Sequence, residues 1–232
     1  MPVAIITGAS EGFGRALAED LAEEGWRLVI DGRDADRLTL AADAIRNLGA
    51  TVDAIVGDVT DEAHRADLVE AATQSGHLDL VVNNASTLGP SPLPPLLSYP
   101  LAAYEDVLRT NVVAPLALLQ LTLPALTASG GTIVDISSDA AVEGYEGWGG
   151  YGSAKAALDQ VTRVLAAEHP DLHVYSFDPG DMRTRMHQDA FPGEDISDRP
   201  LPATVVPALR RLLREAPPSG RYRAVDLLVT EP

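Results

Sequence analysis

The chain has 232 residues, of which 46% are hydrophobic, 22% charged and 5% aromatic. This length and mixed composition are typical of one large globular domain and exclude the collagen-like, coiled-coil and disordered classes. Acidic residues outnumber basic ones 34 to 17, and the net charge of −17 makes nucleic acid and anionic membranes poor partners. The absence of cysteine excludes disulfides, thiol nucleophiles and thiolate metal sites.

Nothing in the chain indicates a membrane span or a secretory signal. No run approaches the roughly 18 uninterrupted apolar residues of a spanning helix. The first apolar run begins at Val3 without a charged start or a cleavage site. The five histidines show no ligand spacing, so we expect no metal site. We expect a cytoplasmic protein that binds neither nucleic acid nor membrane.

Short apolar runs alternate with helix-like stretches along the chain. The pattern predicts strands at Val3–Thr7, Arg27–Asp31, Thr51–Val56, Leu78–Asn83, Thr132–Ser137, His173–Asp178 and Ala224–Val229. It predicts helices at Arg15–Glu24, Ala35–Asn47, Glu62–Ser75, Ala102–Leu126, Ser153–Glu168 and Ala203–Arg214. Strict alternation implies right-handed crossovers and a parallel sheet with helices on both faces. We therefore expect residues 1–232 to form a single Rossmann-type, doubly wound α/β domain, whose ligands bind beyond the carboxyl ends of the strands.

Two segments interrupt this alternation, and each follows a predicted strand. Residues 86–100 contain five prolines, which predicts extended chain over the surface instead of helix. Residues 182–202 are polar and loop-like but include Phe191, Ile196 and Leu201. Long loops at the carboxyl edge of a sheet form substrate walls or lids. We expect residues 182–202 to be the substrate-binding loop, with a plain surface connection as the alternative.

The first predicted strand runs into a glycine-rich turn, Thr7-Gly8-Ala9-Ser10-Glu11-Gly12-Phe13-Gly14, and a helix follows. Glycines at such a turn let the backbone come close to a ligand. The helix N-terminus offers free N–H groups and a positive dipole end to a pyrophosphate. The turn predicts a dinucleotide site, and a turn that binds nothing is the alternative. The expected contacts are Gly8, Ser10, Gly12, Phe13 and Gly14.

The single lysine of the chain, Lys155, lies four residues after Tyr151 on a predicted helix, so the two side chains share one face. The 16 other basic residues are all Arg. A phenol has a pKa of about 10, and a nearby ammonium lowers this pKa because it stabilises the phenolate. The pair predicts a general acid–base, and two ordinary helix-surface residues are the alternative.

These features stand in one order with four others, Asn83-Asn84-Ala85, Asn111, Ser138 and Pro179-Gly180. Together they resemble the short-chain dehydrogenase/reductase family, from Val3 to about Thr184. The resemblance implies a nicotinamide dinucleotide in the cleft and hydride transfer to or from a carbon–oxygen centre. The expected partner is therefore a small carbonyl or alcohol substrate.

The resemblance also implies roles for individual residues. Ser138 would donate a hydrogen bond to the substrate oxygen, with Ser137 as the alternative, and Tyr151 would be the acid–base. Asn111 would hold a water that links Lys155 to solvent, and an Asn that caps the helix or faces solvent is the alternative. Asn83 would brace the fourth strand. Further contacts to the cofactor are implied for Asp58 and Val59 at the adenine, for Asn84 and Ala85, for Pro179 and Gly180 beneath the nicotinamide, and for Thr184 at its carboxamide.

The choice of cofactor depends on the end of the second strand. Relatives that use NAD carry an acidic residue where this chain has Gly32, and Arg33 follows. An Arg makes charge-assisted hydrogen bonds to a ribose 2′-phosphate, which favours NADP (NADPH). NAD is the alternative, because Asp31 and Asp34 flank Arg33 and Glu11 stands where many NADP-preferring relatives have a basic residue. Arg33 could also be a solvated surface charge.

We therefore expect an NADP-dependent oxidoreductase. The second hypothesis is a sensor or scaffold that binds NADP without turnover. The presence of Asn111, Ser138, Tyr151 and Lys155 argues against it, because a protein that only binds the cofactor has no need of all four. An epimerase or dehydratase is a third, although such relatives carry a larger C-terminal substrate domain. The C-terminal residues depart from the family's glycine-rich tail. We expect a homodimer or homotetramer paired through the helices around Ala102–Leu126 and Ser153–Glu168.

Overall fold

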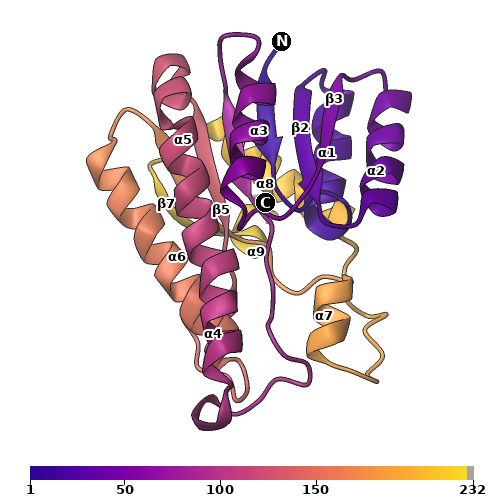
Figure 1. Ribbon diagram of the computed structural model, residues 1–232, viewed down its shortest axis with the longest axis vertical. Coiled ribbons are helices and arrows are strands. Elements are labelled where there is room, and N and C mark those ends of the chain that lie inside the picture. The colour runs from indigo at the N-terminus through magenta and orange to yellow at the C-terminus, as the bar shows by residue number, and fades with distance from the viewer. Residues whose placement is uncertain (229–232) are drawn as a thin grey trace.

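The computed structural model describes residues 1–228 and shows a seven-stranded parallel sheet (Figure 1). The strand order is β3-β2-β1-β4-β5-β6-β7, which confirms the doubly wound α/β fold expected from the sequence. The chain reverses direction across the sheet between β3 and β4, so the carboxyl ends of β1 and β4 lie at a topological switch point. The strands are β1 Val3–Ile6, β2 Arg27–Gly32, β3 Val52–Val56, β4 Leu80–Asn83, β5 Thr132–Ile136, β6 His173–Asp178 and β7 Gly220–Arg223.

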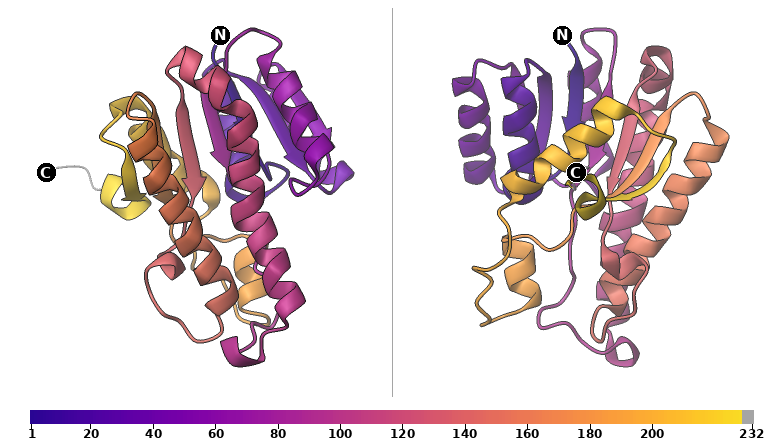
Figure 2. Two further views of the ribbon diagram at one scale, coloured as in Figure 1. Left: turned by 60° about the vertical axis from the view of Figure 1, so that its left-hand side comes forward. Right: turned by 180° about the vertical axis from the view of Figure 1, so that it is seen from behind.

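Helices cover both faces of this sheet (Figure 2). The main helices are α1 Gly12–Glu23, α2 Ala35–Asn47, α3 Glu62–Thr73, α4 Leu101–Leu108, α5 Ala114–Ser129, α6 Gly149–Glu168 and α8 Pro202–Glu215. Shorter turns are η1 Leu96–Ser98, η2 Arg109–Val113, η3 Asp139–Ala141, α7 Arg185–Ala190 and α9 Ala224–Leu228. In Figure 1, α7 and the beginning of α4 extend beyond the carboxyl ends of the strands.

Side-chain alternation along the buried strands divides the interior into two cores. In β1, Ala4 and Ile6 pack with α1, α2 and α8, whereas Val3 and Ile5 pack with α3 and α5. All four residues are buried, as a parallel strand covered on both faces requires. In β6 the second face carries Ser176 and Asp178 after Val174, so polar groups enter the interior on the α6 side.

One predicted strand at the C-terminal side is wrong, and one expected loop contains a short helix. The expected strand Ala224–Val229 is the helix α9 up to Leu228, and Val229 lies outside the described residues. The last strand is instead Gly220–Arg223, which the periodicity missed because its residues are polar and form an edge of the sheet. The segment expected to be a loop, residues 182–202, contains α7. Thr184 begins α7 by accepting a hydrogen bond from the His187 N–H at 3.1 Å.

The helix predicted at Ala102–Leu126 is interrupted near its middle. Arg109–Val113 form a π-helical turn between α4 and α5. Such turns are rare and frequently accompany functional sites, because the inserted residue points a side chain out of the regular helical spacing. Here the turn directs Asn111 into the interior, where it is fully buried.

Among residues 1–228, one helical run is long and apolar enough to cross a membrane by length and composition alone. It is Leu101–Ser129, with a mean hydropathy of 1.6 and a third of its most apolar window buried. Leu118, Leu119 and Leu126 on its inner side belong to the core beneath the sheet. The run is therefore a layer of this fold, with further apolar residues on its outer side.

Candidate functional site

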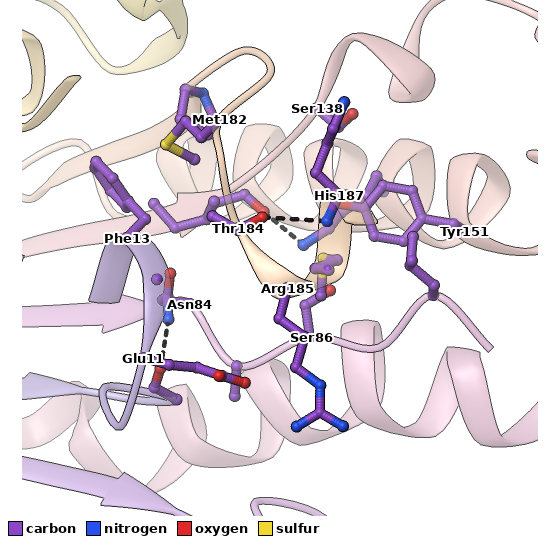
Figure 3. A pocket seen from close by; sticks show the side chains of 18 of the residues that line it. Glu11, Phe13, Asn84, Ser86, Ser138, Tyr151, Met182, Thr184, Arg185 and His187 are labelled. Carbon is purple, nitrogen blue, oxygen red and sulfur yellow. Dashed lines mark hydrogen bonds between the residues drawn. The ribbon is translucent and has the colours of Figure 1, made fainter. Parts of the chain in front are cut away.

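A cavity of about 610 Å³ lies at the carboxyl ends of the central strands. Figure 3 shows Glu11, Phe13 and Asn84 at one end and Ser86, Ser138 and Tyr151 at the other. The structure places most of the expected site residues on its lining: Gly8, Ser10, Gly12, Phe13, Arg33, Asp58, Val59, Asn84, Ala85, Ser138, Tyr151, Lys155, Pro179, Gly180 and Thr184. Gly14 and Asn111, which were also expected at the site, lie behind the lining.

The glycine turn brings the backbone of β1 against the chain that follows β4. Gly8 has a φ of 66°, and a Cβ there would lie 2.8 Å from the Ala85 Cα, so only glycine fits. The Asn84 side chain contacts Gly14 and donates to the carbonyls of Thr7 at 2.8 Å and Gly8 at 3.1 Å. Gly14 and Asn84 therefore hold the shape of the turn.

A buried carboxylate beneath the turn was not identified from the sequence. Asp31, at the end of β2, accepts a hydrogen bond from the Gly8 N–H at 2.6 Å. Its other oxygen lies 2.9 Å from the Nε2 of His64 on α3. Asp31 and His64 are both buried. The Asp31 side chain thus binds the turn and His64. The residues that follow it, Gly32 and Arg33, line the outer part of the cavity.

Arg33 and Asp58 line the outer end of the cavity. The Arg33 side chain is 73% exposed, and its Nη1 lies 4.0 Å from an Asp58 carboxylate oxygen. Partial burial raises the pKa of Asp58, but hydrogen bonds from Thr60 and the Arg33 charge outweigh it and hold this pKa below its usual value. Arg37, which the sequence analysis overlooked, pairs with Glu11 at 2.8 Å and with Asp34 at 3.3 Å. Arg33 therefore has the guanidinium that is more open to a ligand.

At the inner end, Lys155 is enclosed beneath Tyr151. The residue is 1% exposed, and its ammonium donates to the Ile136 carbonyl at 2.6 Å and lies 5.5 Å from the centroid of the Tyr151 ring. Burial lowers the pKa of Lys155 to about 8, although the carboxylates of Asp135 and Asp159 act in the opposite direction. A cation is thus held against the phenol by two buried anions.

The hydroxyl of Tyr151 faces two serines. Burial raises the pKa of Tyr151 above that of an ordinary phenol, and Asp178 and Asp139 raise it further, whereas hydrogen bonds with Ser86 and Ser138 lower it. The protein alone therefore favours the protonated phenol.

The two neighbouring serines after β5 have different environments. Ser138 donates to Asp139 at 2.9 Å, and its oxygen accepts from the Ala140 N–H at 3.2 Å. Ser137 is buried, and its hydroxyl has no hydrogen-bond partner within residues 1–228, although the residue lines the cavity. Of the two, Ser138 is the serine that acts to lower the pKa of Tyr151.

The Asn111 side chain forms hydrogen bonds with the segment that follows β4. Its Oδ1 accepts from Ser86 Oγ at 3.1 Å and from the Thr87 N–H at 2.9 Å, while its Nδ2 donates to the Thr87 carbonyl at 2.8 Å. Ser86, which donates to Asn111, is also one of the groups that lower the pKa of Tyr151. Ser86 was not among the site residues expected from the sequence, because its contacts depend on the π-helical turn.

The remaining wall of the cavity is mainly aromatic and apolar. Trp148 packs edge-on against Tyr151 at 5.7 Å and lies 6.0 Å from Phe191, as measured between ring centroids. Met186 and Leu88 complete this wall. His187 is buried against Phe191 and lies 3.7 Å from Asp181. Such a wall suits an apolar group close to the polar hydroxyls.

Residues 2–195 match a family model described as short chain dehydrogenase. The chain belongs to the short chain dehydrogenase family. The match, together with relatives named as an oxidoreductase and a reductase, also gives the general class of reaction, which is oxidation or reduction at CH–OH or C=O groups.

Individual relatives agree with this membership. The chain is 35% identical over 198 residues to the rhamnolipids biosynthesis 3-oxoacyl-[acyl-carrier-protein] reductase of Pseudomonas aeruginosa, covering 79% of this chain and 74% of that protein. A short chain dehydrogenase from Shigella flexneri complexed with NADP matches at a TM-score of 0.89 and 29% identity over 97% of both chains. An alcohol dehydrogenase from Thermococcus sibiricus complexed with 5-hydroxy-NADP matches at 0.86 and 27%, over 96% of this chain and 95% of that one.

Replacing Asp31 tests its support of the glycine turn. We expect Asp31→Ala to lower the free energy of unfolding by about 2–4 kcal/mol, because it leaves the Gly8 N–H and His64 buried without their partner. Urea unfolding measures this. Asp67→Ala removes an exposed carboxylate from the same helix as His64 and should change stability by less than about 0.5 kcal/mol. Equal losses in the two variants would contradict the assignment.

Proposed function

We propose that this protein is an NADP-dependent oxidoreductase that transfers hydride between the cofactor and a carbonyl or alcohol carbon of a small substrate. The observation that carries this proposal is the convergence of Ser138, Tyr151 and Lys155 at one end of a cavity whose other end is a glycine turn opening a helix. A binding-only protein has no need of a phenol held between a buried ammonium and two hydroxyls.

The cavity fits a dinucleotide on its own geometry. Glu11 at the N-cap of α1 gives no side-chain hydrogen bond to the first turn, which leaves helix N–H groups for a pyrophosphate. Ser137 lines the cavity, and its buried hydroxyl has no hydrogen-bond partner among the described residues 1–228. The solved relatives that contain NADP or 5-hydroxy-NADP support the same cofactor here, with NAD as the alternative.

Each part of that cofactor has residues proposed to bind it. Arg33 would pair with the 2′-phosphate, since its guanidinium is largely exposed at the outer end. The pyrophosphate would lie on the glycine turn. Asp58 and Val59 would contact the adenine. The proposed contacts further along the cavity are Asn84, Ala85, Tyr151, Lys155, Pro179, Gly180 and Thr184.

In the proposed mechanism the side chains control the oxygen of the substrate. When bound, the nicotinamide supplies the hydride for reduction or takes it up in oxidation. Ser138 donates a hydrogen bond to the substrate oxygen and stabilises its developing negative charge. Tyr151 gives its proton to that oxygen in reduction and removes it in oxidation. Because the pKa of Tyr151 is raised in the protein alone, the phenol holds its proton ready for reduction.

Lys155 stabilises the phenolate that reduction leaves behind. One of its three N–H groups goes to the Ile136 carbonyl, and the others remain for the cofactor's ribose hydroxyls. We propose that Asn111 holds a water that returns protons from solvent to Lys155. This role is additional to the contacts that its side chain makes with Ser86 and Thr87.

The substrate lies, in this proposal, between the Tyr151 hydroxyl and the aromatic wall. We propose that the described residues 1–228 act as one domain and that residues 182–202 within it are the substrate-binding segment. Met182, Met186 and Phe191 of that segment line the cavity. This lining favours a carbonyl compound with an apolar or aromatic substituent. We propose that the protein acts in the cytoplasm.

We also propose that two or four copies assemble through α5 and α6. These helices leave large apolar side chains on the surface, with Val113 beside α5, Leu121 on α5 and Val164 on α6 all at least 43% exposed. A second copy would cover this apolar surface from water.

Tyr151→Phe tests the chemistry. We expect turnover to fall by about 10²–10⁴-fold, because the acid–base is removed, while NADPH affinity stays within about threefold, a difference of less than 1 kcal/mol. NADPH oxidation with a panel of aryl and alkyl aldehydes and ketones measures turnover. The matched control is Tyr104→Phe, since Tyr104 lies on α4 away from the cavity lining. Normal turnover by Tyr151→Phe would refute the proposed mechanism.

Arg33→Ala tests the cofactor preference. A charge-assisted bond to phosphate contributes about 1.5–3 kcal/mol, so we expect NADPH binding to weaken by about tenfold or more and NADH binding to stay unchanged. Titrations followed by nicotinamide fluorescence measure both. Arg46→Ala, an exposed arginine at the far end of α2, is the control. Tighter binding of NADH than of NADPH to the unaltered protein would overturn the preference.

Leu121→Arg tests the assembly. We expect the unaltered protein to have the mass of two or four chains in size-exclusion chromatography with light scattering. A buried, unpaired arginine at the interface costs several kcal/mol, so the variant should shift towards smaller species. Leu40→Arg, at an exposed leucine on α2, should leave the mass unchanged. A single-chain mass for the unaltered protein would contradict the proposed assembly.

A further inference from the structure

Arg221 on β7 reaches from the edge of the sheet to the reacting end of the cavity. In the register of β6 with β7, Arg221 lies opposite Ser176. Residues opposite each other in neighbouring strands put their side chains on the same face of the sheet, and Ser176 faces α6, where it donates to Asp159 at 2.6 Å. The Arg221 side chain is therefore directed beneath α6 and is only 19% exposed.

The guanidinium donates to three acceptors. Its Nε lies 3.1 Å from Asp159, and its Nη2 lies 2.8 Å from Asp178 and 3.0 Å from the carbonyl of Ser138. The side chains of both aspartates are at most 5% exposed. A planar fork of donors suits this arrangement, because one side chain must reach several acceptors in fixed directions.

Each acceptor belongs to a different segment of the proposed site. Ser138 is the proposed donor to the substrate oxygen. Asp159 lies one helical turn after Lys155 on α6. Asp178 ends β6, and its second oxygen accepts from the Gly180 N–H at 3.0 Å, which fixes the turn proposed to lie beneath the nicotinamide. The three segments meet at Arg221.

We propose that Arg221 is a positioning residue for hydride transfer, which holds Ser138, α6 and the Asp178–Gly180 turn in one arrangement and neutralises the two buried carboxylates beneath Tyr151. This inference rests on the proposed function. It gives the last strand a role in the chemistry as well as in the sheet.

The surroundings of Tyr151 give the expected direction of the effect. The groups that face it are Lys155 on its own helix, Asp139 of η3 and Asp178 of β6, with His187 of α7 on the same cavity wall and Asp135 of β5 behind Lys155. Asp178 already raises the pKa of Tyr151. Loss of the Arg221 charge leaves this carboxylate without its nearest cation, so the pKa of Tyr151 rises further and the phenolate forms only at higher pH.

The test compares Arg221→Met with Arg221→Lys and with Arg223→Met. Arg223 lies two residues further along, is exposed, pairs with Asp226 of α9 and has only a weak charge interaction with Asp178, so it is a control from the same strand for the loss of the directed contacts. Each protein is saturated with NADP⁺ and titrated with base, following phenolate absorbance. Subtracting the curve of the same protein carrying Tyr151→Phe isolates the Tyr151 signal. NADPH affinity is measured alongside by fluorescence.

We expect Arg221→Met to raise the midpoint of the Tyr151 titration by about one pH unit, a tenfold change in its ionisation. NADPH binding should weaken by about tenfold, because the turn at Gly180 loses its support. Arg221→Lys should show smaller shifts of both kinds, since lysine keeps the charge but not the three directed contacts. Arg223→Met should behave like the unaltered protein.

Several results would overturn the inference. One is a folded Arg221→Met protein with unaltered titration and NADPH affinity, and another is equal losses in Arg223→Met, which would mark a general effect of the edge strand. If Arg221→Met does not fold, Arg221→Lys decides, and unaltered values in that protein refute the positioning role. An unaltered protein that binds neither NADPH nor NADP⁺ refutes the proposed function itself, and the inference with it.

Discussion

A charged amine buried in the interior is the constraint on which the inner end of the site depends. Lys155 is enclosed between the sheet and α6, and removing an ammonium from water costs several kcal/mol unless other charges compensate for it. Asp135 and Asp159 provide that compensation. Asp135 is itself held by hydrogen bonds from Asn83 at 2.7 Å and Thr162 at 2.7 Å, so the cost is spread over several elements.

This requirement explains why the two faces of the sheet differ. On the face covered by α1, α2 and α8, β6 contributes Tyr175 and Phe177 to the core. The opposite face carries Ser176 and Asp178 instead, and their partners come from α6 and β7. A polar layer of this kind stabilises only when nearly all its members are paired. It thereby fixes how the elements around Tyr151 lie relative to one another.

The features that could be predicted from the sequence are those set by local spacing. The glycine turn and the Tyr151–Lys155 pair each lie within one short segment, and buried strands reveal themselves by apolar runs. Asp31, Ser86 and Arg221 could not be assigned in this way, because their contacts depend on strand order, on register and on a π-helical turn that has no clear pattern. The polar strand β7 was missed for the same reason, since pairing with β6 and not hydrophobicity defines it.

The position of β7 also bears on how the molecule is made. The chain emerges from the ribosome in order, and six of the seven strands are complete well before Arg221 is synthesised. Until then no guanidinium lies between Asp159 and Asp178, so the two carboxylates repel each other at the edge of the sheet where β7 will pair with β6. The first six strands are therefore synthesised before the residue that joins the segments of the site. The contacts of Arg221 with Asp159, Asp178 and Ser138 form only when β7 pairs with β6. A chain that ends before residue 220 would lack both β7 and the guanidinium that joins Asp159, Asp178 and Ser138.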